Sequence, residues 1–401
     1  MPAYSAYLRN LLLATVASGA VVGAVNLLID PYGIFGSPAV DGLNQLKPAS
    51  AERTRVVKPY FSDRMHAAAV IGGNSRPELG LDPESDCWPA RLQPVFNAGI
   101  PGASIRTQSL YAMHASGDRT KRILQGVDFL DFIRRKSAGK PESAPLPPRT
   151  ADESRLRIPG LMPADAAYWL QRTKDRLTAL FSLSALGDSI YTVAAQRNKN
   201  ASTRTPSGFN PARDYLDIIR TEGQHVLFAQ KNRELRRGLQ QAYVVEADDG
   251  SPGSGFTALR TLIAWSRQRD IKVTLFINPY HADYLANIEA SGNWPVFETW
   301  KTMLTAMAAQ EDVDLWDFNT VDAYTTESPP SAGNRENMLQ WFWEPAHYRS
   351  TLGELMLATM LDQPCTDAHA KARFGVRLTR TTLEADLMQL REHLREYRSR
   401  D

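Results

Sequence analysis

A serine directly after a predicted strand is the first residue in this chain whose type and position suit nucleophilic chemistry. In "AVIGGNSRPELG" (69–80), Ser75 follows an apolar run and two glycines, Gly72 and Gly73. Glycines permit the sharp turn that exposes a side chain and its backbone N–H at the carboxyl end of a strand. The pattern makes Ser75 a candidate nucleophile, and an ordinary turn or cap serine is the alternative.

A second serine lies in a literal Gly-Asp-Ser sequence, "ALGDSIYT" (185–192). Apolar residues around it recur at helical spacing, so Ser189 has no strand in front of it. The spacing therefore predicts that Ser189 lies in a helix and that Ser75 is the nucleophile.

An acid and a histidine with complementary chemistry lie near the C-terminal end of the apolar pattern. In "WFWEPAHYRSTLGELML" (341–357), Glu344 stands three residues before His347. A carboxylate in this position can fix the tautomer of the imidazole while the ring takes a proton from a serine. A surface pair without a catalytic role is the alternative for these two residues.

Two further positions suggest an oxyanion hole. "FNAGIPGAS" (96–104) places Gly102 in a tight loop after the second predicted strand, and "GVDF" (126–129) places Asp128 at the end of the third. The backbone N–H groups of Ser75 and Gly102 could face a developing oxyanion. Gly102 as a turn residue and Asp128 as a cap are the structural alternatives.

Four polar residues are candidates for the substrate cleft. Asn74 and Arg76 flank Ser75, and Asn278 and His281 follow the fourth predicted strand in "FINPYHADYL" (276–285). A hydrogen-bonded structural histidine is the alternative for His281.

The cysteines and histidines show no metal-binding pattern, so we expect neither a metal nor an organic cofactor.

Short apolar runs alternate with amphipathic stretches and indicate the elements that would position these residues. The runs that read as buried strands are 66–72, 94–99, 122–130, 271–278 and 312–318. Candidate helices cover 103–117, 253–269, 295–310 and 348–361. Strands that alternate with helices predict an α/β fold with a parallel sheet covered on both faces, and ligands bind beyond the carboxyl ends of its strands.

One long segment interrupts this alternation. Residues 136–163 are rich in proline and polar residues, and a helical region follows from about 164 to 245. We interpret about 136–250 as an insertion between the third and fourth strands. A cap or lid over the site and a surface insertion without a role in binding are equally good interpretations.

The first thirty residues predict a membrane anchor. Residues 11–29 carry no charge, and as a helix they span roughly 28 Å at about 1.5 Å per residue, the thickness of one bilayer core. A cleavable signal peptide ending at "ASGA" (17–20) is the rival, but its apolar region is short. Arg9 precedes the span and acidic residues follow it, which places residues 1–10 in the cytoplasm and the bulk in the periplasm or cell exterior.

The composition gives no reason to expect a nucleic-acid partner, and it leaves open whether the two cysteines form a disulfide. The chain has 401 residues with 46 Lys and Arg against 44 Asp and Glu, a net charge of +2. This balance gives no electrostatic reason for nucleic-acid binding. Cys87 and Cys365 are the two cysteines. They are either joined by a disulfide, which an oxidising compartment permits, or simply buried.

The order of these motifs resembles the SGNH, or GDSL-like, hydrolase superfamily. It is most similar to the membrane-anchored cell-envelope branch, which includes relatives of the D-alanyl transfer protein DltD and polysaccharide O-acetylation proteins. Gly73, Asn74 and Ser75 match the serine block of that family, Gly102 its loop glycine, and Glu344 to His347 its acid-histidine block. The "NLLIDPYGIFG" segment (26–36) also resembles this branch.

The resemblance implies a flavodoxin-like three-layer fold and a catalytic Ser75, His347 and Glu344. Asp128 occupies the position where the family usually has an oxyanion-binding asparagine, so its carboxyl is either protonated or turned elsewhere. The resemblance divides the chain into an anchor (11–29), a connecting segment (30–62), an SGNH-like domain (63–365) and a charged helical tail (366–401).

The function that this resemblance implies is that of an esterase or O-acyltransferase. It would act outside the cytoplasm on an acylated cell-envelope glycan or lipid-linked substrate, with envelope polysaccharide or acyl-donor proteins as partners. The alternative is a catalytically inactive glycan-binding or scaffold subunit of an envelope polysaccharide assembly.

Overall fold

Five parallel strands and one antiparallel edge strand form the central sheet. The computed structural model describes residues 2–136, 149–363, 365 and 374–399. The strand order is β10-β7-β6-β3-β1-β2, and only β10 runs antiparallel to its neighbour, β7. The bounds are β1 (Ala69–Gly72), β2 (Val95–Asn97), β3 (Arg122–Val127), β6 (Lys272–Ile277), β7 (Asp314–Asp317) and β10 (Val376–Arg377).

Neighbouring residues of these strands point to opposite faces, and both faces are covered. Val70 belongs to a large apolar cluster with residues of the helices α5, α11 and α13. Its neighbour Ile71 lies in a separate cluster with residues of α14. A strand buried on both faces must be apolar at successive positions, which explains the continuous apolar runs. The helix bounds are α5 (Ile105–Ala115), α11 (Ser254–Arg267), α13 (Trp294–Gln310) and α14 (Ser350–Leu361).

The α/β fold that the sequence predicts is confirmed, with a correction at one edge. The five predicted strand regions contain β1, β2, β3, β6 and β7. The sheet is mixed rather than wholly parallel, because β10 from the C-terminal tail pairs antiparallel with β7. A strand of two residues leaves no periodicity in the sequence, so this edge could not be predicted.

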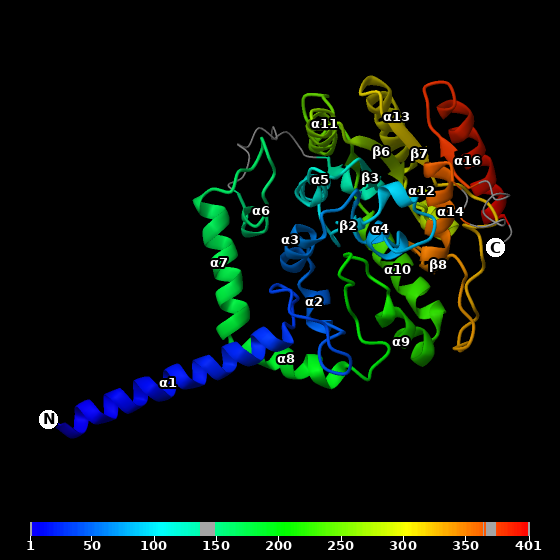
Figure 1. Cartoon of the computed structure of the whole chain (residues 1–401). Helices are drawn as coiled ribbons and strands as arrows, with labels where there is room; N and C mark the ends of the chain where they lie inside the picture. Colours follow the sequence, from blue (N-terminus) through cyan, green and yellow to red (C-terminus); the bar gives the residue numbers. More distant parts are fainter. Residues whose placement is uncertain (1, 137–148, 364, 366–373, 400–401) are drawn as a thin grey trace.

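The N-terminal helix α1 (Pro2–Ile29) projects from the domain (Figure 1). It is long and apolar enough to cross a membrane. The next segment, predicted as a connection, contains the helices α2 (Pro48–Glu52) and α3 (Thr54–Met65). Val57 and Tyr60 of α3 are buried in the same cluster as Val70, so α3 is part of the core.

The inserted segment leaves and re-enters the domain through a short two-stranded sheet. In it, β4 (Arg134–Arg135) pairs antiparallel with β5 (Tyr243–Val244). Between these strands lie the helices α6 (Ala151–Ser154), α7 (Ala166–Phe181), α8 (Leu183–Ala195), α9 (Arg213–Glu222) and α10 (Gln224–Gly238). The insertion has two separate locations, since α7 and α8 contact α1 whereas α10 contacts α12 (Ala282–Ala290) and the strand β8 (Phe342–Glu344).

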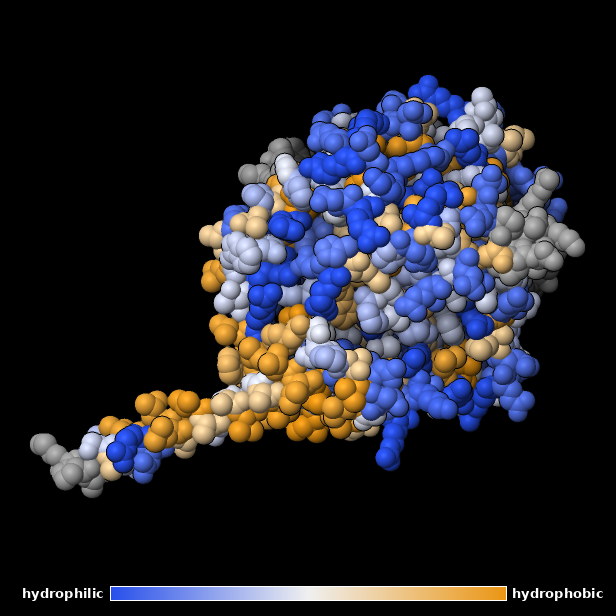
Figure 2. Space-filling view, viewed as in Figure 1, coloured by the Kyte–Doolittle hydropathy of each residue, from blue (hydrophilic) through white to orange (hydrophobic). Residues whose placement is uncertain are grey.

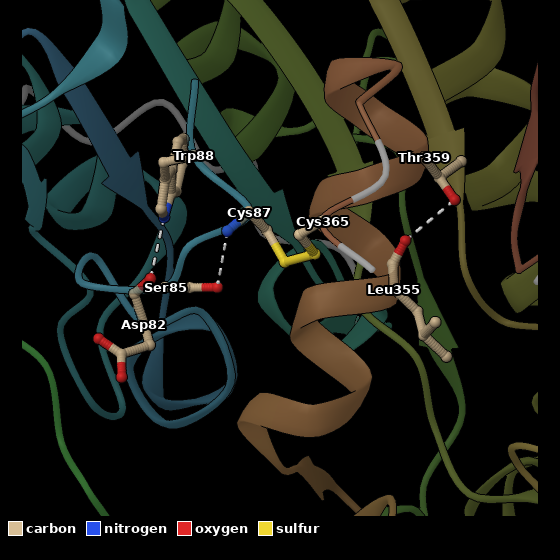
Figure 3. The surroundings of a disulfide bond; sticks show 7 residues. All are labelled: Asp82, Ser85, Cys87, Trp88, Leu355, Thr359 and Cys365. Carbon is tan, nitrogen blue, oxygen red and sulfur yellow. Dashed lines mark hydrogen bonds between the residues drawn. A yellow bond between two sulfur atoms is a disulfide. The ribbon is translucent and has the colours of Figure 1, made fainter. Parts of the chain in front are cut away.

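The C-terminal end of the chain is tied to the domain in two ways. The helix α16 (Leu383–Arg398) contacts α12 and α13 and buries Leu390 and Leu394. A disulfide joins Cys365, just after α14, to Cys87 in the loop that precedes β2 (Figure 3). The structure therefore selects the bonded state of the two cysteines, which the sequence left open.

Candidate active site

Ser75 is the first residue of the short helix α4 (Ser75–Gly80), which begins just after β1. The turn between them contains Gly73, whose φ of +143° is unfavourable for other residues. A Cβ at this position would also lie 2.4 Å from Pro77. Asn74 caps the helix by accepting a hydrogen bond from the backbone N–H of Arg76. The turn thus places Ser75 at the carboxyl end of a central strand, where its own N–H lies at the free end of a helix.

The acid and the histidine face each other across a hairpin. In it, β8 pairs antiparallel with β9 (His347–Tyr348), and Glu344 lies opposite His347. The Oε1 atom of Glu344 contacts Nδ1 of His347. The backbone N–H of Ala346 in the turn donates to the other carboxylate oxygen at 2.8 Å. The hairpin therefore fixes the carboxylate against one side of the imidazole ring.

The other side of the imidazole meets the serine. Nε2 of His347 lies 2.7 Å from Oγ of Ser75, although the residues are 272 positions apart. When Nδ1–H donates to Glu344, Nε2 is free to accept the hydroxyl proton of Ser75. Ser75, His347 and Glu344 thus form a continuous hydrogen-bonded chain.

Glu344 is buried but is held in its ionised form. Burial alone would raise the pKa of its carboxyl, yet the adjacent His347 and their hydrogen bond outweigh burial and lower the pKa below its usual value. An ionised carboxylate in a buried position stabilises a positive charge on the neighbouring imidazole. This is the charge that His347 acquires when it takes a proton.

Ser75 and His347 line a cavity of about 420 Å³. The neighbouring wall comes from the insertion and is formed by Lys231, Glu234, Leu235, Gly238 and Leu239 of α10 and the adjoining turn. Arg76, Leu130, Ile133, Tyr243, Tyr284 and Ala346 complete the lining. The cavity is therefore apolar on one part of its surface and carries charged groups on another.

Asp128 lies in a buried polar network beside α4. Its carboxylate accepts hydrogen bonds from the side chains of Asn74 at 2.5 Å and Asn278 at 3.1 Å, and lies 3.2 Å from Nη1 of Arg76. Arg76 also donates to the backbone carbonyl of Ala346, in the turn before His347. Asp128 thus holds residues on both sides of Ser75 and links them to the hairpin that carries His347.

A second acid, Asp131, belongs to this network and holds its proton more tightly than an ordinary aspartic acid does. Burial, followed by the nearby charge of Asp128, raises the pKa of Asp131 to about 7. Asp131 accepts hydrogen bonds from Gln108 at 2.8 Å and from Asn74 at 3.1 Å. The side chain of Asn74 is therefore shared between two acids.

Gly102 and Asp128, which the sequence suggests for the oxyanion hole beside Ser75, both lie outside the lining of the cavity. Among the described residues, those that line it include neither Gly102 nor Asp128. Gly102 is exposed in the loop before α5, with a φ of +60°, and its carbonyl accepts a hydrogen bond from Arg55. The part of this loop that approaches the serine turn is Ile100, whose N–H donates to the carbonyl of Gly73 at 2.9 Å.

Of the four cleft candidates, Arg76 lines the cavity and three are buried elsewhere. Asn74 is occupied by the network just described. Asn278 donates to Val127 and Asp128 and accepts from the hydroxyl of Tyr348. His281 is fully buried and caps α12 by accepting from the backbone N–H of Asp283. This burial explains why the pKa of His281 is lowered.

Ser189 lies far from this chemistry, within α8. Its side chain is buried and donates to Oδ1 of Asn26 in α1 at 2.9 Å. The literal Gly-Asp-Ser sequence therefore forms part of a helix contact.

A buried ion cluster fixes the helix α4, which carries Ser75. Glu78 of α4 lies 2.9 Å from Nζ of Lys58 on α3 and 2.9 Å from Nε of Arg204 in the insertion. Burial lowers the pKa of Lys58 to about 8, although Glu78 favours its charged form. One carboxylate thus joins three separate parts of the chain beneath Ser75.

The cavity residues of α10 were not predicted from the sequence. Lys231 and Leu235 lie four positions apart on one face of α10, and Leu239 follows four positions later, just after the helix ends. This spacing does not indicate what the face covers. Within the described ranges, no group of three or more His, Cys, Asp or Glu side chains could hold a metal ion.

No family model matches the chain, and no curated protein is significantly similar to it.

Proposed function

We propose that this chain is a membrane-anchored SGNH-like serine esterase or O-acyltransferase that acts outside the cytoplasm. The observation that carries the proposal is the hydrogen-bonded chain of Ser75, His347 and Glu344 at the edge of a cavity. A hydroxyl, an imidazole and an ionised carboxylate in this order are the groups that acyl transfer through a covalent intermediate needs.

The sheet supports the same proposal. Its parallel strands follow the order 2-1-3-4-5 when counted along the chain, which is the order of flavodoxin-like folds. Ser75 and the cavity lie beyond the carboxyl end of β1, where ligands bind in such sheets. The order of the motifs in the sequence agrees with the superfamily that it resembles.

In the proposed reaction Ser75 and His347 act in two steps, while Glu344 stabilises the positive charge on His347. His347 accepts the proton of Ser75 as Oγ attacks the acyl carbonyl, and the N–H of Ser75 stabilises the oxyanion. The protonated His347 then gives its proton to the leaving alkoxide, and an acyl-serine remains. Water or an acceptor hydroxyl attacks this ester after His347 removes its proton, and Ser75 regains a proton as it leaves. Gly102 and Asp128 are not needed for these steps.

The cavity favours an ester whose acyl group is short and whose alcohol part is polar. Leu130, Ile133 and Leu235 offer an apolar surface to the acyl group, while Lys231, Glu234 and Arg76 offer partners for hydroxyl groups. An acylated cell-envelope glycan or lipid-linked substrate combines both features. The disulfide and the apolar α1 support a location on the outer side of the cytoplasmic membrane.

Labelling with a fluorophosphonate probe tests the proposal, because such probes react with an activated serine. The full chain in detergent should be labelled, and Ser75→Ala should abolish the label. Ser189→Ala is the matched control, and its labelling should stay within about twofold because Ser189 touches no reacting group.

Two outcomes would overturn the proposal. One is an unlabelled wild-type protein whose cooperative thermal unfolding shows that it is folded, which would favour the inactive glycan-binding or scaffold alternative. The other is a label that survives Ser75→Ala but disappears in Ser189→Ala.

A further inference from the structure

An exposed apolar surface surrounds the point where α1 meets the domain. We call it the α7–α8 face and define it by large apolar side chains that are 39% to 75% exposed: Trp169, Leu170, Leu177 and Phe181 of α7, with Leu183, Ile190, Tyr191 and Val193 of α8. Figure 2 shows hydrophobic colouring that continues from α1 onto this part of the domain. The catalytic proposal does not use this surface.

The α7–α8 corner contacts α1 within its apolar stretch. A Cβ at Gly23 would lie 3.0 Å from the ring of Phe181, and the amide of Asn26 donates to the carbonyl of Leu180 at 2.8 Å. The distance from Gly23 to the end of α1 at Ile29 is about 9 Å of helix at about 1.5 Å per residue. Helices that lie in a membrane interface are buried to a similar depth, about 5–10 Å. If α1 crosses a bilayer, the corner lies at the level of the lipids.

The polar groups at this corner are paired as a lipid environment requires. Asn26 is fully buried and donates to the carbonyls of Leu180 and Ser182, where α7 ends. It also accepts a hydrogen bond from the side chain of Ser189. Ser182 caps α8 by accepting from the N–H of Ala185 at 3.1 Å. A break between helices is tolerated at membrane depth only when its free backbone groups find partners.

The acidic side chains of α7 and α8 are paired with other residues, and the exposed charged side chains on α7 are basic. Asp188, the one charged residue of α8, accepts a hydrogen bond from Tyr32 at 2.5 Å. On α7, Arg172 and Asp175 are buried against the domain. Lys174 and Arg176 are exposed on α7 near the apolar side chains. Basic residues beside an apolar face with Trp are typical of helices that lie among lipid headgroups.

The end of α1 is fixed to the domain rather than joined by a flexible linker. Lys47 donates to the carbonyls of Ile29 at 3.1 Å and Asp30 at 2.7 Å. The carboxylate of Asp30 accepts from the backbone N–H of Gly36 at 2.9 Å. In Figure 1, α7 runs across the direction of α1. A helix across the anchor can lie along the membrane surface.

We propose that the α7–α8 face is embedded in the interfacial region of the outer leaflet beside α1. Lipid acyl chains cover Phe181, Leu183 and their apolar neighbours, and phosphate groups lie near Lys174 and Arg176. The domain is therefore held at a fixed height and orientation on the bilayer, which presents the Ser75 cavity to substrates at the membrane surface. This inference rests on the membrane anchoring proposed above.

Quenching by lipids that carry bromine on their acyl chains tests the contact. A small fluorophore is attached to a single introduced cysteine in the full chain, since Cys87 and Cys365 are already joined. The test positions are Leu170→Cys and Leu183→Cys, at 73% and 75% exposed. Met388→Cys on α16, at 59%, is the matched control, and Leu13→Cys on α1, also at 59%, reports anchoring. The vesicles contain phosphatidylcholine and phosphatidylglycerol, with and without brominated phosphatidylcholine.

The expected result is a loss of fluorescence at positions 170 and 183 comparable with the loss at 13, and none at 388. Quenching at 13 without quenching at 170 and 183 would overturn the inference and leave the anchor intact. Cysteine cross-linking between two chains through position 183 would then assign the face to a second copy. No quenching at 13 would contradict the anchoring proposal itself. Equal quenching at 388 would overturn a specific role for this face.

Discussion

Glu344 has one role that its geometry defines, namely to orient and stabilise the imidazole of His347. Its carboxylate contacts Nδ1 and is anchored by the N–H of Ala346. An amide in its place can donate to Nδ1, which favours the tautomer with the proton on Nε2. That tautomer cannot accept the proton of Ser75.

We therefore predict that Glu344→Gln slows fluorophosphonate labelling by a factor on the order of 10⁴. The rate of labelling at neutral pH measures this effect, and the exposed Glu336→Gln is the matched control. Thermal unfolding checks that both variants are folded. A labelling rate within tenfold of wild type would remove Glu344 from the proposed mechanism.

Asp131 should make the stability of the protein depend on pH. Burial raises its pKa to about 7 in the folded protein, from an ordinary value of 3.8. Between these values the folded state holds a proton that the unfolded state has lost. The contribution of Asp131 to the free energy of unfolding therefore falls as the pH rises through this window.

Asp131→Asn removes this titration, so its stability relative to wild type should increase from acidic pH up to about pH 7 and then level off. Denaturant unfolding of both proteins at several pH values measures the difference. The exposed Asp118→Asn should show no such trend. A constant difference across the pH range would mean that Asp131 is ionised in the folded protein.

Among the elements, α4 depends on a close approach to α14. A Cβ at Gly353 of α14 would lie 1.8 Å from the carbonyl oxygen of Gly80, and a Cβ at Gly80 would lie 1.9 Å from the ring of Tyr348. Tyr348 directly follows His347 in β9. The packing of these two helices therefore also determines where the serine and histidine meet.

Gly353→Ala should destabilise the protein by about 1–3 kcal/mol, because the added methyl group overpacks a tight contact. It should also slow labelling of Ser75, since α4 must shift. Gly187→Ala in α8 is the control, because nothing lies within 4 Å of its added Cβ. This variant should gain up to about 1 kcal/mol from helix propensity. Equal stability of the two variants in thermal unfolding would show that the helices separate easily.

For the whole molecule, the disulfide closes a long loop of the chain. Cys87 and Cys365 are 278 positions apart. This loop contains the insertion, His347 and most of the sheet. A cross-link over such a span restricts the unfolded chain strongly.

The double variant Cys87→Ser, Cys365→Ser should lose about 2–5 kcal/mol of stability. Denaturant unfolding in detergent measures this loss, and a reductant should lower the stability of the wild type but not of the variant. Protein purified from membranes should contain no free thiol. Two reactive thiols in that protein would contradict both the bond and the proposed location in an oxidising compartment.

The sequence alone determined the local features of this protein. The strands around Val70 and Ile123, the apolar helix α1 and the helical location of Ser189 follow from periodicities that span a few residues. Such patterns reflect the preferences of neighbouring residues, so the helices and strands that they indicate can be predicted without knowing how the rest of the chain folds. The chemical types of Ser75, His347 and Glu344 were also visible.

Only the tertiary structure decided which distant residues meet. It brought His347 to Ser75 and paired Asp128 with Arg76 instead of placing it among the cavity residues. It also divided the insertion, so that α10 lines the cavity whereas α7 and α8 contact α1. It also joined the two cysteines and added β10 to the sheet. These contacts depend on how whole helices and strands pack. The residues that bury one another or form an ion pair come from segments far apart in the sequence, and no local pattern shows which segments will meet.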